Sequence, residues 1–165
     1  MARDRGLTVV TTAFEHLSAR EAYDVWRLRQ DVFVVEQECA YPDLDGRDPD
    51  PATRHLLLVD AERLVGYARV LDDGDVRRIG RVVLDRSVRG RGWADRLVQA
   101  ALALCGGQAA VLDAQSPLVG WYATFGFSVA GPEFLEDGIP HVPMRRPPGD
   151  PPPLPPLPDR FLTRP

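Results

Sequence analysis

The sequence has 165 residues and a mass of 18.3 kDa, enough for one domain with one hydrophobic core. Hydrophobic residues make up 44% and charged residues 27%, which excludes a collagen, a disulfide-rich scaffold and a wholly disordered chain. The formal net charge of −4 offers no general attraction to nucleic acid or to an anionic membrane, so we expect neither partner, and any anion site must be local.

The first third of the chain predicts a strand, a helix and a long loop. Residues 7–14 are rich in Val and Thr, which is typical of a strand. Ser18 and Glu21 have the spacing of a capping box, and apolar residues then recur at helical spacing to about Glu36. Residues 39–54 contain three prolines, which predicts a long surface loop, and such loops often carry function.

The rest of the chain predicts a small sheet with two further helices. Three strands separated by short turns form an antiparallel meander: 55–60, 64–71 and 76–84. The apolar period then becomes helical over residues 94–105, and two glycines end that helix. A short strand, a helix and an irregular β segment follow: 109–113, 117–124 and the remainder to Arg146.

These elements predict a single mixed α/β (α+β) domain over residues 1–146, with a central, mostly antiparallel sheet flanked by helices. Residues 147–165 contain nine of the sixteen prolines and predict a flexible polyproline II tail. A P-x-x-P-x-R pattern in this tail is favoured as a chance match over a recognition motif. No run is apolar enough for a signal peptide or a membrane span, so we expect a cytoplasmic protein.

Several classes of site are excluded by residue type. All 20 cationic residues are arginine, so the chain has no lysine for a Schiff base, a nucleophile or a Walker A loop. Cys39 and Cys105 form no C-x-x-C pair, and we expect neither a zinc site nor a redox pair. His16, His55 and His141 lack metal-ligand spacing and are interpreted as structural, so no metal is expected.

The glycine-containing segment 89–94, with the sequence RGRGWA, stands between a strand and a strongly periodic helix. Glycine lets the backbone approach a ligand closely, and the N–H groups and dipole at a helix N-terminus favour an anion such as pyrophosphate. The alternative is a tight turn with exposed arginines. A nucleic-acid-binding RGRG tract would need repeats and a basic surface, which are absent.

The order of these elements around an R-x-x-G-x-A loop resembles the GCN5-related N-acetyltransferase (GNAT) superfamily over about residues 7–146. Segments 32–37, 55–57, 79–83 and 136–141 are similar to its ElaA branch. The resemblance implies a bulge that splays the strand before the loop from the next strand. It also implies an acetyl-CoA site, with the pyrophosphate held by the loop and the pantetheine arm paired with the strand backbone, at Val82, Val83, Leu84, Arg89, Gly90, Arg91, Gly92, Trp93 and Ala94.

The segment 121–127, W-Y-A-T-F-G-F, resembles the late helix of the family, whose tyrosine is the usual general acid. The resemblance therefore implies that Tyr122 protonates the leaving thiolate, whose thiol has a pKa of about 8.5. The alternative is a tyrosine that only packs between aromatic neighbours. The family often supplies a glutamate as general base from the strand before the loop, but residues 76–84 contain none. Several bases stay open, as does a water chain: Glu36, Glu38, Asp113 and His141.

The acidic loop that contains Asp43, Asp45 and Asp48 lacks the spacing of an EF-hand, because Arg54 occupies the position of the bidentate glutamate. We hypothesise that these carboxylates face the acceptor and attract a cationic amine, with a solvated charged loop as the alternative.

Taken together, the motifs predict an enzyme that transfers an acetyl group from acetyl-CoA directly to a primary amine, without a covalent intermediate. The alternatives are a catalytically silent acyl-CoA sensor that contacts a protein partner, and a simple nucleotide-binding module. Exposed edge strands leave a homodimer open.

Overall fold

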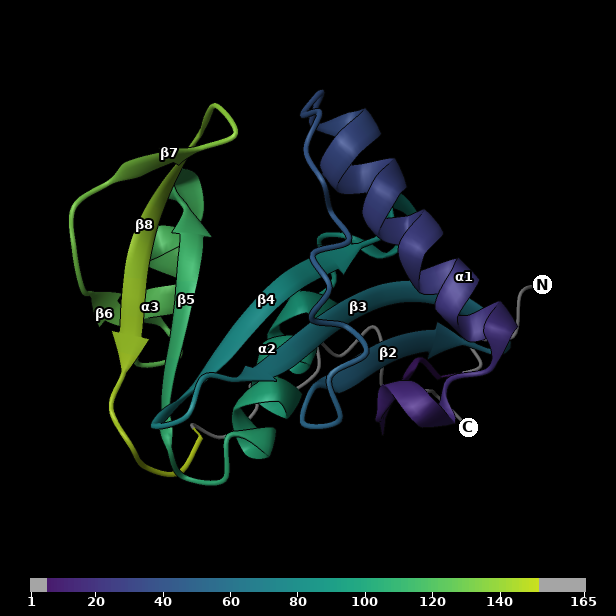
Figure 1. Cartoon of the computed structure of the whole chain (residues 1–165), viewed down its shortest axis with the longest axis horizontal. Coiled ribbons are helices and arrows are strands. Elements are labelled where there is room, and N and C mark those ends of the chain that lie inside the picture. The colour runs from purple at the N-terminus through teal and green to yellow at the C-terminus, as the bar shows by residue number, and fades with distance from the viewer. Residues whose placement is uncertain (1–5, 152–165) are drawn as a thin grey trace.

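The computed structural model of the chain describes residues 6–151 (Figure 1). In that part, eight strands form one sheet in the order β1-β2-β3-β4-β5-β8-β6, with β7 paired to β8. All pairs are antiparallel except β4 with β5, which are parallel. The strands are β1 (Thr8–Thr12), β2 (Arg54–Asp60), β3 (Arg63–Asp72), β4 (Val76–Leu84), β5 (Ala109–Gln115), β6 (Ser128–Val129), β7 (Phe134–Glu136) and β8 (Ile139–Arg146). The mixed α/β fold with a mostly antiparallel sheet is confirmed.

Two longer helices, α1 and α2, cover opposite faces of the β2–β4 region, and a short one, α3, lies behind the β5–β8 side (Figure 1). The α-helices are α1 (Ala19–Arg29), α2 (Trp93–Leu104) and α3 (Val119–Ala123). Short 3-10 helices precede the three α-helices: η1 (Phe14–His16), η3 (Arg86–Val88) and η4 (Ser116–Leu118). The π-helix η2 (Gln30–Glu36) continues α1. None of the helices in residues 6–151 is long and apolar enough to cross a membrane.

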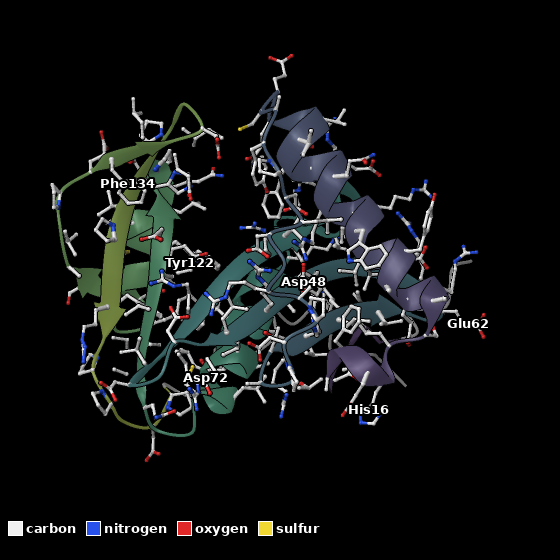
Figure 2. All side chains as sticks on the ribbon, viewed as in Figure 1. His16, Asp48, Glu62, Asp72, Tyr122 and Phe134 are labelled. Atoms are coloured by element: carbon white, nitrogen blue, oxygen red, sulfur yellow. The ribbon has the colours of Figure 1, made fainter. Side chains whose placement is uncertain are left out.

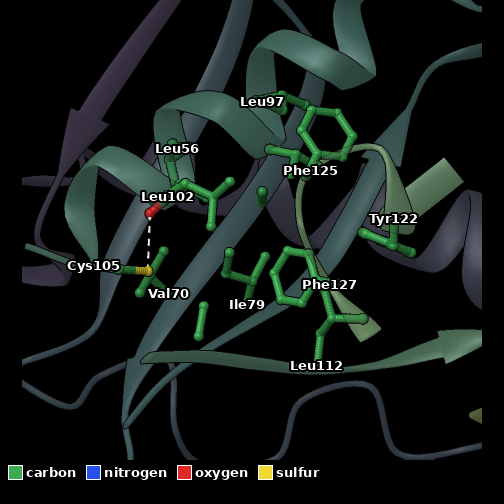
Figure 3. Packing of buried hydrophobic residues seen from close by; sticks show 14 of the residues in the cluster. Leu56, Val70, Ile79, Leu97, Leu102, Cys105, Leu112, Tyr122, Phe125 and Phe127 are labelled. Carbon is green, nitrogen blue, oxygen red and sulfur yellow. Dashed lines mark hydrogen bonds between the residues drawn. The ribbon is translucent and has the colours of Figure 1, made fainter. Parts of the chain in front are cut away.

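The hydrophobic core is divided by the sheet into two clusters. On the α2 side, Leu97 and Leu102 of α2 pack with Ile79 of β4 and with Phe127, as Figure 3 shows. The apolar residues of α2 recur at helical spacing, so this face was predictable. The smaller cluster lies under α1 and includes Tyr67 of β3. The two clusters therefore cover both faces of β3 and β4.

The first helix is shorter than the sequence predicts. The capping box is confirmed: the Glu21 N–H donates to Ser18 Oγ, and Ser18 N–H donates to Glu21 Oε2. The α-helix ends at Arg29, however, and the expected continuation to Glu36 is a π-helix. The wider turns of a π-helix change the side-chain register. Two residues of this segment, Val32 and Phe33, both pack against the smaller core cluster.

The first strand and the last β segment differ slightly from their predicted bounds. The first strand stops at Thr12 because a 3-10 turn begins at Phe14, and the last β segment resolves into β6, β7 and β8. The strand β8 ends at Arg146, where the domain boundary was placed. Just beyond it, Gly149 N–H donates to the Gly107 carbonyl at 3.1 Å. The expected flexible tail lies outside the described residues from 152 onward.

Candidate functional site

The site is organised around the point where β4 and β5 separate. These strands pair only from Val76 to Arg78 of β4, with Ala109 to Val111 of β5. Beyond that point they diverge, as Figure 1 shows. The edge of β4 that faces β5 then has no strand partner over its last six residues, and unpaired backbone N–H and C=O groups there are open to a ligand.

The divergence coincides with a bulge in β4. Tyr67 of β3 pairs with Val83 of β4, and Arg69 pairs with Gly80. The two pairs are therefore two residues apart on β3 but three residues apart on β4. Arg81 takes up the extra residue at φ = 55°. An unpaired extra residue bends a strand and increases its twist. The bulge that the family resemblance implied is therefore present, and it turns β4 away from β5.

A cavity of about 620 Å³ lies in the gap between the diverging strands. Figure 2 shows Tyr122 between the β5–β8 side and the β2–β4 side of the molecule. The main lining residues come from β4, β5, α3 and β8: Ile79, Gly80, Arg81, Val82, Asp113, Gln115, Tyr122 and His141. Of the expected site residues, Val82 and Tyr122 line this cavity, whereas Val83, Leu84 and segment 89–94 do not.

The glycine loop leads directly into α2. Gly90 and Gly92 adopt positive φ angles of 71° and 80°, and Gly92 is the N-cap of α2 without a side-chain hydrogen bond. The first intrahelical hydrogen bond runs from Arg96 N–H to the Gly92 carbonyl. The first turn of a helix carries N–H groups that the helix does not satisfy, and its dipole is positive there. The backbone is therefore shaped to receive an anion.

The arginine of this loop is held by an acid from η2. Arg89 Nη1 and Nη2 donate to the two carboxylate oxygens of Glu36 at 3.2 and 2.9 Å, and Arg86 also donates to Glu36. Hydrogen bonds from Arg89 and Arg86 lower the pKa of Glu36. A carboxylate that two arginines keep ionised and occupied is poorly placed to accept a proton. The sequence offered no signal for this pairing.

The other expected cofactor residues have different surroundings. The Trp93 side chain is buried in the larger core cluster, which anchors the end of the loop to the core. Arg91 is exposed. The Leu84 carbonyl accepts from Arg89 Nε at 3.0 Å, and Val83 is buried under α1. The loop is thus tied to the end of β4 through Arg89.

Tyr122 lines the cavity and is buried, with 7% of its surface exposed. Its ring contacts Trp121 and Phe127, and burial raises the pKa of its phenol to about 12. The neighbouring Trp121 Nε1 donates to Asp95 Oδ1, in the first turn of α2, at 2.6 Å. This bond joins the helix that carries Tyr122 to the glycine loop. A phenol in these surroundings stays protonated at neutral pH, as a proton donor must.

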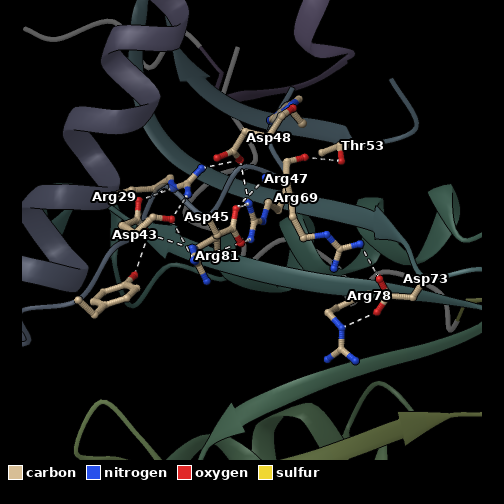
Figure 4. A network of polar contacts seen from close by, with 12 residues as sticks. Arg29, Asp43, Asp45, Arg47, Asp48, Thr53, Arg69, Asp73, Arg78 and Arg81 are labelled. Carbon is tan, nitrogen blue, oxygen red and sulfur yellow. Dashed lines mark hydrogen bonds and ion pairs between the residues drawn. The ribbon is translucent and has the colours of Figure 1, made fainter. Parts of the chain in front are cut away.

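The acidic loop is occupied by arginines, as Figure 4 shows. We call this set the arginine–aspartate network: Arg29, Arg69, Arg81, Asp43, Asp45 and Asp48. Arg29 Nε donates to Asp43 at 2.7 Å, and its Nη1 donates to Asp48 at 2.8 Å. Burial opposes ionisation of Asp48, but the hydrogen bond and charge of Arg29 prevail and lower its pKa.

The network changes the interpretation of those carboxylates. Three aspartates face three arginines, so their formal charges cancel, and only Asp45 of the three lines the cavity. The hypothesis that they attract a cationic amine therefore loses its basis, and their role is to fold the loop over β3 and β4. A sequence signal existed: Arg29 follows Val25 by four residues, on the buried face of α1.

The histidines and cysteines give no metal site. Within residues 6–151, no group of three or more His, Cys, Asp or Glu side chains is placed to hold an ion. His55 is buried, with Nδ1 2.6 Å from the Tyr67 hydroxyl and Nε2 3.0 Å from the Asp48 carbonyl, as expected for a structural histidine. Burial lowers its pKa.

This architecture is similar to that of known proteins in both sequence and structure. Residues 27–147 match the family model described as an acetyltransferase (GNAT) domain. A UPF0039 protein of Mycobacterium tuberculosis is 48% identical over 136 residues, which cover 79% of this chain and 87% of that protein. The crystal structure of Escherichia coli ElaA matches at a TM-score of 0.81 with 35% identity, over 86% of this chain and 99% of that one. An acyl-CoA N-acyltransferase structure from Pseudomonas aeruginosa matches at 0.79 with 36% identity, over the same shares.

Proposed function

The chain belongs to the GNAT acetyltransferase family, in its ElaA-like branch, and from that membership we propose that it transfers an acetyl group from acetyl-CoA directly to a primary amine of a small molecule or a protein. The observation that carries the proposal is the bulged, diverging end of β4, which opens the cavity beside the strand that leads to the glycine loop. Family membership supports an acyl-CoA substrate, and we propose in addition that the acyl group is acetyl and that the acceptor is an amine.

Acetyl-CoA fits the chain's own groups. The N–H groups at the start of α2, together with Gly90 and Gly92 at positive φ, would hold the pyrophosphate. Arg89 would exchange Glu36 for a phosphate oxygen. The free edge of β4 near Val82 would pair with the pantetheine arm, and its N–H groups would polarise the thioester carbonyl. The pyrophosphate at the start of α2 and the thioester beside β4 would then be joined by the pantetheine arm along the edge of β4.

Tyr122 is the proposed proton donor to the leaving sulfur. With a pKa of about 12 the phenol is fully protonated at neutral pH, but it is a weaker acid than a thiol of pKa about 8.5. Proton transfer therefore has to accompany the breaking of the C–S bond, when negative charge develops on sulfur. The Trp121–Asp95 hydrogen bond holds this tyrosine's helix against the first turn of α2.

One observation favours a catalytically silent acyl-CoA sensor as the alternative. The strand β4 contains no glutamate, and Glu36, which binds the loop arginine Arg89, is held by two arginines. A sensor needs only the cofactor site. The two functions share acetyl-CoA binding and differ in turnover.

Binding is tested first, by calorimetric titration with acetyl-CoA. We expect wild type to bind and Gly92→Glu to lose measurable binding, because the substitution adds bulk and negative charge at the α2 N-cap. Gly74→Glu is the matched control: Gly74 has φ = 82°, a Cβ there meets open space, and it lies in the β3–β4 turn. Equal loss in both variants, or no binding by folded wild type at about millimolar cofactor, contradicts the proposal.

Turnover is tested by release of free thiol from acetyl-CoA in the presence of a panel of primary amines. The panel contains butylamine, spermidine, free lysine and a peptide with an unblocked N-terminus. We expect Tyr122→Phe to lower thiol release by about a hundredfold while acetyl-CoA affinity changes little. Binding by wild type without thiol release for any amine favours the sensor.

A further inference from the structure

We propose that His141 is the residue that accepts the proton of the acceptor amine, an inference that rests on the proposed acetyl transfer. His141 lies on β8, where it pairs with Gln115 of β5, and its side chain lines the same cavity as Tyr122. It is mostly buried but reaches the cavity, with 12% of its side chain exposed. The two residues come from different elements, α3 and β8.

The tautomer of His141 follows from its partner. Its Nδ1 lies 2.8 Å from the Ile139 carbonyl oxygen. A carbonyl only accepts hydrogen bonds, so Nδ1 carries the hydrogen and the neutral ring has its lone pair on Nε2. A histidine general base is oriented in this way: one nitrogen is anchored by its N–H and the other is left basic.

The surroundings of Nε2 suit a nitrogen that becomes charged. Glu136 of β7 has a carboxylate oxygen 3.8 Å from Nε2, close enough to stabilise an imidazolium but beyond hydrogen-bond distance. The Phe134 ring stacks on the imidazole at 5.9 Å between centroids and holds its plane. Asp137, in the β7–β8 turn, also lines the cavity and adds negative charge that attracts an ammonium group.

The other candidate bases are committed elsewhere. Glu36 is bound by Arg86 and Arg89 and does not line the cavity. Asp113 lines it, but Arg78 Nη1 donates to its carboxylate at 3.2 Å. An arginine partner stabilises the ionised form and makes the carboxylate a weaker base. Glu38 is not among the residues that line the cavity. Among the candidate residues in the described part of the chain, His141 alone combines access with an unoccupied basic atom.

The proton balance assigns each step to a group. The acceptor enters as an ammonium ion and gives one proton to His141 Nε2, which later passes it to water at the cavity mouth. The amine nitrogen then attacks the thioester carbon, so a C–N bond forms and the C–S bond breaks. After attack, the nitrogen loses a second proton to His141 Nε2 while Tyr122 donates its proton to the sulfur. The tyrosinate regains a proton from water, so the net products are an amide, free CoA thiol and one proton released to water.

The test compares His141→Gln with His16→Gln in thiol release. Glutamine keeps a hydrogen-bonding side chain but has no basic nitrogen, and the His16 side chain is 72% exposed, next to Glu15. The acceptor is whichever amine of the panel wild type uses fastest. We expect kcat/KM at neutral pH to fall about a hundredfold in His141→Gln and to stay unchanged in His16→Gln, while acetyl-CoA affinity is unaffected in both.

Two readouts separate proton transfer from a merely structural role. Amines of this class have a pKa of about 10, so the free amine predominates at higher pH and the defect of His141→Gln should shrink there. The other charged residues that line the cavity are unchanged in the variant, so the ratio of the two activities isolates the loss of the imidazole: Asp45, Arg47, Arg69, Arg78, Arg81, Asp113, Glu136 and Asp137. In addition, imidazole should restore part of the activity of His141→Ala, whereas the equally sized but weakly basic pyrazole should not.

The outcomes decide between the two proposals. A pH-dependent defect with rescue by imidazole supports His141 as the base. Wild-type activity in His141→Gln, or a defect that is equal at every pH and insensitive to imidazole, overturns this inference and leaves the acetyltransferase intact. If wild type binds acetyl-CoA but releases no thiol with any amine, acetyl transfer fails, and the inference about His141 fails with it.

Discussion

Two groups of arginines in this protein are paired with carboxylates in the same way but differ in how deeply they are buried. The centre of the arginine–aspartate network is buried: 0% of the Arg29 side chain and 3% of the Arg69 side chain are exposed. The second group, which we call the loop cluster, consists of Arg86, Arg89 and Glu36, and the two arginines are 77% and 39% exposed. Burial therefore separates charges that belong to the fold from charges that a ligand can take over.

The energetic reason is the environment of each pair. Removing one partner of a buried ion pair costs about 3–5 kcal/mol because the other charge stays desolvated. An exposed pair contributes about 0–1 kcal/mol, since water replaces the lost partner. Breaking the buried pairs of the network is therefore expensive, whereas separating the exposed Arg89 from Glu36 costs little. Three predictions test this difference.

The largest expected effect is on stability. Arg29→Met should lower the free energy of unfolding by about 3–5 kcal/mol, because Asp43 and Asp48 lose their shared buried partner. Urea denaturation followed by circular dichroism measures it. The control is Arg27→Met, whose exposed side chain pairs with Asp31 at 3.7 Å and which should change stability by less than about 0.5 kcal/mol. Similar losses in both variants would show that burial makes no difference here.

A second effect should appear in acid. The network's arginines, against the opposing effect of burial, lower the pKa of Asp48 in the folded state, while an unfolded aspartate has a pKa of about 3.9. The unfolded chain therefore binds more protons below about pH 4, so the free energy of unfolding falls as the pH falls through that window. Urea denaturation at a series of pH values measures this slope. At neutral pH, Asp48→Asn should have a lower free energy of unfolding than wild type, and this free energy should fall less steeply as the pH is lowered. The same slope in both proteins would contradict the lowered pKa of Asp48 in the folded state.

The smallest expected effect is on the loop cluster. Glu36→Gln should tighten acetyl-CoA binding by up to about tenfold, or about 1.4 kcal/mol, because the carboxylate no longer competes with phosphate for Arg89. Stability should change by less than about 1 kcal/mol. Calorimetry measures both wild type and variant, with Arg89→Gln as the opposing control that weakens binding. Weaker binding by Glu36→Gln would mean that Glu36 positions Arg89 instead of competing for it.

Much of the fold follows from local patterns that the structure confirms. The apolar spacing of α2 and the capping box of α1 depend on residues a few positions apart, so they were readable from the sequence. The glycine loop was equally local, since Gly92 supplies the left-handed backbone at the α2 N-cap. The helical segment that begins with α1 ends at Glu36, as predicted, but the change to a π-helix after Arg29 was not predicted from the sequence. In the π-helix, Val32 and Phe33 pack against the smaller core cluster, which is a tertiary contact.

The acidic loop shows the limit of sequence reasoning most clearly. Three nearby aspartates suggested a binding surface, but their partners come from α1, β3 and β4, up to 38 residues away. Nothing local distinguishes a carboxylate that meets solvent from one that meets a buried guanidinium. The same holds for Glu36, which lies 53 residues from Arg89.

The residue pattern by itself predicted the fold class and the glycine loop before α2, because both depend on short-range periodicity or on glycine's conformational freedom, whereas the choice of Tyr122 came from the resemblance to the family. Only the tertiary structure decided which charges neutralise one another and which nitrogen of His141 is basic. Electrostatic roles depend on distance and desolvation, and these are set by strands and loops that meet only when the chain folds.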